Sequence, residues 1–138
     1  MTTAPEPFRF THFITVQPED IDALNHANNV RYVQWVQDTA GAHWLTATPA
    51  EEQPNYVWVV REHHIRYLAP ALLGDELRCT TWVSKMEGVT SQRHVRIERA
   101  ADGKLLCEAE TQWVLLDPKT MRPMRIMPEV AARVWEAV

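Results

Sequence analysis

The sequence predicts an α+β fold in which one long helix lies across an antiparallel sheet of five strands. An apolar stripe with helical spacing follows an early strand, and four β-rich segments come after it. The turn signals Glu87-Gly88 and Asp102-Gly103 join three of those later segments. Short connections of this kind favour antiparallel neighbours, and a helix with one apolar face must bury that face on the sheet.

The first strand is expected at residues 8–16, followed by a polar loop at 17–28. The helix is expected to begin near Asn28 or Asn29, because asparagine is a favoured N-cap residue. Helical spacing of apolar residues continues to about Leu45. The stripe predicted to face the sheet consists of Val30, Val33, Val36, Ala40 and Trp44.

A connecting loop at 46–54 leads to a long β-rich run at 56–68, whose centre is Glu62-His63-His64. Alternation of apolar and polar residues marks the other strands. They are expected after a turn at 70–75, at about 77–84, 94–98 and 105–115. A short C-terminal helix is expected from Pro128, because proline suits the first turn of a helix.

The composition indicates a single globular domain, 1–138, of which 46% is hydrophobic and 23% charged. Eighteen acidic against fourteen basic residues give a formal net charge of −4, which argues against general nucleic-acid binding. No apolar run approaches the ~20 residues of a membrane span, and the N-terminus lacks a signal-peptide pattern. A cytoplasmic protein with no nucleic-acid or membrane partner is therefore expected.

The sequence also predicts no metal site. Cys79 and Cys107 lack the spacing of metal ligands and are expected to be reduced thiols in the core. His63 and His64 are adjacent, so on a strand they point to opposite faces and do not easily share an ion.

The segment from Asp22 to Asn29 contains the densest group of candidate catalytic side chains. One carboxylate, one imidazole and three amides fall within eight positions, directly before the predicted helix. The free backbone N–H groups of a helix N-terminus can stabilise a developing negative charge. A carboxylate beside them is placed to attack a carbonyl or to deprotonate a water.

Each of these residues also has a simpler structural explanation. Asp22 suits an Asx turn before the helix, and Asn28 or Asn29 suits the helix cap. His26 suits a loop position in which a backbone carbonyl satisfies its ring. Capping and catalysis are compatible, because a cap holds the helix N–H groups in place.

The chain resembles the hotdog-fold thioesterases, specifically the 4-hydroxybenzoyl-CoA thioesterase-like family with its bacterial acyl-CoA thioesterases. The resemblance rests on Asp20-Ile21-Asp22, on the run from His26 to Tyr32, and on the run from Tyr67 to Leu77. The order of elements matches as well, so the resemblance covers nearly the whole chain. Leu24 departs from the pattern of plant acyl-carrier-protein thioesterases, which carry asparagine at that position.

The resemblance implies a sheet wrapped around the long helix, and a homodimer or homotetramer with the thioester bound between subunits. It implies hydrolysis of acyl-CoA without a cofactor, since coenzyme A is part of the substrate. Asp22 matches the catalytic carboxylate, acting as nucleophile or general base. The helix start near Asn29 matches the backbone group that polarises the thioester carbonyl, and His26 and Asn28 match residues that orient the site.

Three further residues are predicted to bind substrate. Tyr32 is the aromatic residue of the first motif, and Ser91 and Arg93 follow the turn at Glu87-Gly88. Polar and basic groups of this kind suit a pantetheine arm and its phosphates, although a solvated surface charge is the alternative for the arginine. Two other functions stay open, an acyl-carrier-protein thioesterase and a non-catalytic acyl-CoA-binding protein of the same fold.

Overall fold

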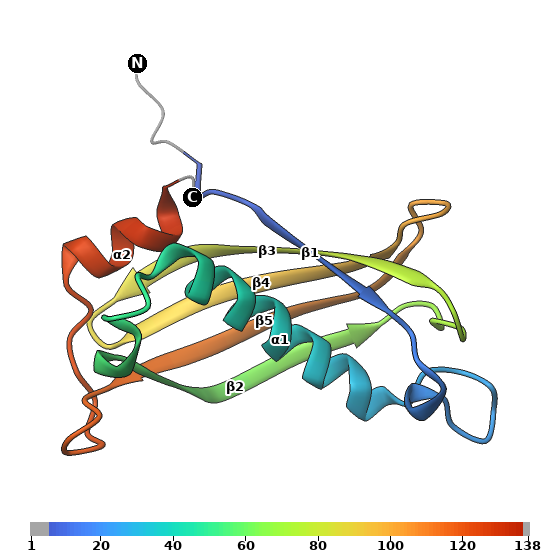
Figure 1. Ribbon diagram of the computed structural model, residues 1–138, viewed down its shortest axis with the longest axis horizontal. Helices are drawn as coiled ribbons and strands as arrows, with labels where there is room; N and C mark the ends of the chain where they lie inside the picture. Colours follow the sequence, from blue (N-terminus) through green and yellow to red (C-terminus); the bar gives the residue numbers. More distant parts are fainter. Residues whose placement is uncertain (1–5, 137–138) are drawn as a thin grey trace.

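The computed structural model describes residues 6–136, which form a five-stranded sheet with one long helix across it (Figure 1). The spatial order of the strands is β1-β3-β4-β5-β2, and all neighbouring pairs are antiparallel. Two single-turn 3-10 helices lie at Pro18–Asp20 and Gln53–Asn55. The main elements are β1 (Phe10–Thr15), α1 (Asn29–Ala47), β2 (Val57–Tyr67), β3 (Glu76–Glu87), β4 (Thr90–Arg99), β5 (Leu105–Leu116) and α2 (Pro128–Trp135). The predicted fold class is confirmed.

The strand order explains the position of α1. Strands β1 and β2 lie at opposite edges of the sheet, so the chain between them must cross the whole face. The 19 residues of α1 span ~28 Å. The helix runs obliquely along the strands, so its N-terminus and C-terminus lie at opposite ends of the molecule (Figure 1).

The two predicted hairpin turns connect β3 to β4 and β4 to β5. Gly88 and Gly103 have φ angles of +62° and +72°, which glycine adopts without strain from a Cβ atom. Pairing continues to Glu87↔Thr90 at the first turn, so β4 begins earlier than the predicted residue 94. Its first inward positions, Ser91 and Arg93, are polar, so the apolar alternation does not reveal this part of the strand.

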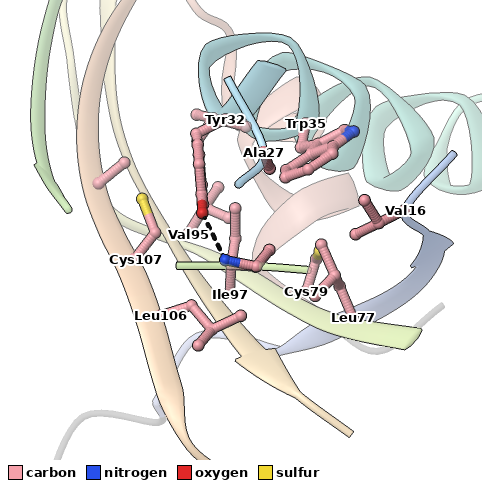
Figure 2. Packing of buried hydrophobic residues seen from close by; sticks show 13 residues of the cluster. Val16, Ala27, Tyr32, Trp35, Leu77, Cys79, Val95, Ile97, Leu106 and Cys107 are labelled. Atoms are coloured by element: carbon pink, nitrogen blue, oxygen red, sulfur yellow. Dashed lines mark hydrogen bonds between the residues drawn. The ribbon is translucent and has the colours of Figure 1, made fainter. Parts of the chain in front are cut away.

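The apolar core has two parts. The first, around the N-terminal half of α1, includes Tyr32, Trp35, Cys79, Ile97 and Cys107 (Figure 2). The second lies at the other end of the helix, where α2 contacts α1 and β3. Its buried members are Trp44, Val83, Val130 and Val134.

The buried face of α1 differs in part from the predicted stripe. Val36, Ala40 and Trp44 are buried as predicted, but Val30 is 72% exposed and Val33 only half-buried. Residues two apart lie ~200° apart around a helix, so Val30 and Tyr32 cannot both face the sheet. The aromatic rings bury more area than valine, which favours the observed face. Its other buried members are Tyr32, Trp35, Thr39 and His43.

A row of polar side chains crosses the sheet between the two parts of the core. Arg93, Thr111 and His63 are register neighbours on β4, β5 and β2. Arg93 Nη1 lies 2.9 Å from His43 Nδ1 and donates to Thr81 Oγ1 at 3.1 Å. Burial lowers the pKa of His43 to about 4, and the nearby charge of Arg93 acts in the same direction. The imidazole is therefore neutral at pH 7, and its Nδ1 accepts the hydrogen bond from Arg93.

Tyr32 connects the start of α1 to the loop before β3. Its hydroxyl accepts a hydrogen bond from the backbone N–H of Ala71 at 2.8 Å, drawn as a dashed line in Figure 2. Both residues are buried, and the Tyr32 ring packs edge-to-face on Trp35 and Tyr67. Ala27 N–H donates to Ala71 O at 2.9 Å, so the same loop also holds the chain just before the helix.

Replacing Tyr32 with phenylalanine is expected to lower the free energy of unfolding by about 1–3 kcal/mol, because the buried Ala71 N–H loses its acceptor. Urea denaturation measures the change. The matched control is Tyr67→Phe, whose hydroxyl makes only a 3.4 Å contact with Asn29 O in an exposed position. Equal losses in the two variants would contradict the assigned role of the buried hydrogen bond.

The stability of the protein is expected to fall as the pH is lowered from 6.5 toward 4. In this range the unfolded chain binds a proton at His43 that the folded chain does not, because the pKa of the buried ring is about 4. Each pH unit costs about 1.4 kcal/mol for such a group. Urea denaturation between pH 7 and pH 4.5 should show a weaker pH dependence for His43→Gln than for the unmodified protein. Identical slopes would disprove the assignment.

Candidate functional site

The loop before α1 folds into a tight turn that holds the Asp22 carboxylate. Asp22 N–H donates to His26 O at 2.8 Å, and Asn25, with a φ of +63°, donates to Asp22 O at 3.1 Å. Asp22 Oδ1 accepts hydrogen bonds from the backbone N–H groups of Leu24 at 2.9 Å and His26 at 3.4 Å. One carboxylate oxygen of Asp22, Oδ1, thus forms the Asx turn that was the simpler structural alternative for this residue. No hydrogen bond within residues 6–136 uses the other oxygen, Oδ2.

The first turn of α1 is capped by Asn28, as one of the alternatives predicted. Its Oδ1 accepts from Val30 N–H at 3.0 Å, and its own N–H donates to Asp20 O at 2.8 Å. Arg31 N–H donates to Asn28 O at 2.8 Å. Among the described residues, nothing accepts a hydrogen bond from the backbone N–H of Asn29. That group carries part of the positive end of the helix dipole.

An ion pair that the sequence motifs did not predict connects this loop to the helix. Arg31 Nε lies 3.3 Å from Asp20 Oδ1, and Asp20 is only 7% exposed. The second oxygen of Asp20 accepts Gln17 N–H at 2.8 Å. Asp20 and Arg31 both occur in the quoted motifs, but eleven positions separate them, and only the fold shows that they pair.

The other predicted residues lie in different surroundings. His26 is exposed at the loop surface, and its ring makes no hydrogen bond, ion pair or aromatic contact with residues 6–136. Tyr32 is 2% exposed, with its hydroxyl occupied by Ala71, so it lies in the core one helical turn after Asn28. Hydrogen bonds thus join Asp22 to His26 and Asn28 to Asp20 within this loop, and Tyr32 contacts the neighbouring Ala71 from inside the core.

Ser91 and Arg93 lie elsewhere in the same chain. They line a cavity of about 310 Å³ at the C-terminal half of α1, together with Trp44 and Val134. From Asn29 to Trp44 the helix rises ~22 Å, so this cavity and the Asp22 loop lie at opposite ends of α1. Arg93 is only 6% exposed, so the alternative of a solvated surface charge is wrong for this residue.

The paired histidines on β2 point to opposite faces, as predicted. His63 Nδ1 lies 2.8 Å from Thr111 Oγ1, and its Nε2 lies 3.4 Å from Gln37 Nε2 on α1. The Gln37 amide nitrogen donates, so Nε2 accepts and Nδ1 carries the proton. Burial lowers the pKa of His63, which keeps it neutral. His64 instead lines a shallow hollow on the outer face with Glu62.

The cysteines are not nucleophiles in this arrangement. Cys79 and Cys107 are free and fully buried on the helix side of the sheet. Burial raises the pKa of each thiol to about 12, so both are protonated at neutral pH. In addition, neither α1 nor α2, nor any other helix among residues 6–136, is long and apolar enough to cross a membrane.

Comparisons with known proteins place this chain among thioesterases. The thioesterase-like superfamily matches residues 16–134. The long-chain acyl-CoA thioesterase FadM of Escherichia coli is 24% identical over 133 residues, covering 91% of this chain and 96% of that protein. The acyl-CoA thioester hydrolase YbgC of Escherichia coli is 30% identical over 122 residues, or 86% and 90% of the two chains.

A solved structure shows the same fold. The protein SAV2348 of Staphylococcus aureus, determined in complex with CoA, matches with a TM-score of 0.82 at 22% identity. The match covers 96% of this chain and 85% of that one. The arrangement of one helix across a five-stranded sheet is therefore the predicted hotdog fold.

Replacing Asn28 with alanine is expected to lower the free energy of unfolding by about 0.5–2 kcal/mol, because Val30 N–H loses its capping acceptor. Asn28→Asp is the matched control, since aspartate caps helices as well as asparagine does. Urea denaturation compares the two variants. A loss of the same size in Asn28→Asp would show that something other than the cap is responsible.

Proposed function

Because this chain belongs to the thioesterase-like superfamily, we propose that it hydrolyses acyl-CoA thioesters to a free acid and CoA. The relatives FadM and YbgC are named for this activity, and they are matched over nearly their whole length. The single observation that carries the proposal lies in the loop before α1 and the first residue of that helix. Asp22 has a half-buried carboxylate with one oxygen, Oδ2, that accepts no hydrogen bond from the described residues. The backbone N–H of Asn29, at the start of α1, finds no acceptor among residues 6–136.

In this proposal the thioester carbonyl oxygen binds at the start of α1. The Asn29 N–H donates to that oxygen, and the helix dipole stabilises the negative charge that develops on it. The Asn28 cap and the Asp20–Arg31 ion pair hold this N–H in place before substrate binds. Preorganised donors of this kind need no rearrangement in the transition state.

Asp22 then acts in one of two ways. As a nucleophile, its Oδ2 forms a bond to the thioester carbon, the C–S bond breaks, and CoA leaves as a thiolate that takes a proton from solvent. Water then hydrolyses the mixed anhydride. As a general base, Asp22 takes a proton from a water that attacks the same carbon. Both routes yield the acid and CoA, and neither needs a cofactor.

The remaining predicted residues have supporting roles in this proposal. His26 is exposed beside Asp22, and its backbone N–H already contacts the carboxylate, so its ring is available to orient the thioester. Tyr32 positions the loop through Ala71 and forms part of the wall beneath the substrate. The partner needed to enclose a substrate is a second copy of the chain, in a cytoplasmic homodimer or homotetramer. The eleven-residue β2 at the sheet edge supports this, since an open edge can pair with another strand.

The central experiment measures thiol release from short, medium, long and aromatic acyl-CoAs. Asp22→Asn is expected to lower kcat by about 10²- to 10⁴-fold, the usual contribution of a positioned acid–base or nucleophilic group. The matched control is Asp38→Asn, because Asp38 is an exposed carboxylate on α1 that, among the described residues, bonds only Gln34. Its activity should equal that of the unmodified protein.

The same assay tests the alternatives. Full activity of Asp22→Asn would remove Asp22 from the reaction. Hydrolysis of acyl-carrier-protein substrates alone would identify that class of thioesterase, and acyl-CoA binding without turnover would identify a binding protein. Rapid quenching separates the two routes, because CoA is released before the acid only when Asp22 is acylated.

A further inference from the structure

The cavity at the C-terminal half of α1 has the size of a small-molecule site. Its volume of about 310 Å³ lies at the lower end of the range of ~300–1,000 Å³ that such sites occupy. Strands β2 to β5, α1 and α2 all contribute to it. Most of the wall is apolar, and three of the six tryptophans line it, Trp44, Trp58 and Trp113.

Arg93 is the only charged side chain among the described residues that line this cavity. Its guanidinium bonds His43 Nδ1 and Thr81 Oγ1, both of which are neutral. No carboxylate in residues 6–136 lies within ion-pair distance of it, whereas Arg99 pairs with Asp75. A buried charge without a counter-charge is costly, so an anion in the cavity would remove a large penalty.

Few other polar groups line the cavity. Ser91 contributes a hydroxyl and Gln53 an amide, but Gln53 Nε2 already donates to Leu45 O and Thr48 O. The cavity therefore combines mostly apolar walls with one cation.

We propose that this cavity binds the carboxylate of an apolar chain, with the carboxylate on Arg93 and the chain along the tryptophans. A carboxylate matches a single guanidinium in charge and in its two-oxygen geometry. The site lies ~22 Å along α1 from the Asp22 loop of the same chain, so binding there does not depend on the proposed reaction.

The charge of the site at neutral pH supports this ligand class. Burial lowers the pKa of Arg93 to about 10, so the guanidinium stays protonated at pH 7. His43 is neutral at that pH. The cavity therefore holds one positive charge, which favours a monoanion over a neutral chain of equal length.

The first test titrates the protein with octanoate, with 1-octanol and with acetate, followed by calorimetry and by tryptophan fluorescence. Octanoate is expected to bind at least about tenfold more tightly than octanol, because a hydrogen bond to a charged group adds that much affinity. Acetate is expected to bind weakly, because it lacks the apolar chain. Arg93→Met keeps an unbranched side chain, shorter than that of arginine, and removes the charge. It should lose the preference for octanoate while still binding octanol.

Two variants keep the test decisive if Arg93→Met does not fold. Arg93→Lys keeps the charge and should retain part of the preference, and Trp113→Leu removes part of the apolar wall and should weaken the binding of octanoate and of octanol by similar factors. Equal affinity for octanoate and octanol in the unmodified protein would overturn the proposal. So would an unchanged preference in a folded Arg93→Met.

Two sources of the carboxylate are distinguished with Asp22→Asn. This variant should bind octanoate as the unmodified protein does, whether or not it has lost thioester hydrolysis. If the ligand is the far end of a dicarboxylic acyl group, the variant should bind hexadecanedioyl-CoA, which is long enough to span the distance along α1 from the Asp22 loop, more tightly than palmitoyl-CoA, and adding Arg93→Met should abolish the difference. Equal binding of the two thioesters, with octanoate still bound, would identify a free acid as the ligand.

Discussion

The burial of one face of α1 against the sheet is the constraint on which the rest of the structure depends. Because β1 and β2 lie at opposite edges, the chain that joins them must pass over the face of the sheet, and α1 runs obliquely along the strands so that its two ends reach opposite ends of the molecule (Figure 1). The Asp22 loop then lies at the positive end of the helix. The apolar cavity lies at the other end, where α2 closes it.

Both ends of α1 are held by polar contacts rather than by apolar packing alone. Near the N-terminus, Ala71 N–H donates to the Tyr32 hydroxyl and Ala71 O accepts from Ala27, so one loop residue fastens two points of the chain. Toward the C-terminal end of the helix, His43 meets Arg93 in the row of polar side chains that divides the core. A buried row of this kind lowers the apolar content of the core, but its hydrogen bonds fix the position of the helix relative to the strands.

The motifs around Asp22 and Asn28 were sufficient to predict the family and the fold. Residues close in sequence carry them, and the geometry of a loop and a helix cap is largely local. The cap at Asn28 and the turn at Asp22 follow from those residue types. The Asp20–Arg31 ion pair does not, because it requires the loop to fold back onto the helix. Arg93 was predicted to contact the pantetheine arm or the phosphates of a substrate, and the structure places it buried in the wall of a mostly apolar cavity.

Alternation, turn residues and the helix stripe determined by themselves the number of strands, their antiparallel connections and the single long helix. These are properties of short segments, since side-chain periodicity and turn chemistry act over a few residues. The tertiary structure alone decided which face of α1 is buried, and that Tyr32 rather than Val30 points to the sheet. It also decided that Ser91 and Arg93 lie far from Asp22. The buried face of α1 and the position of Arg93 depend on packing between segments that are distant in sequence. That packing must bury apolar area and pair buried polar groups at the same time.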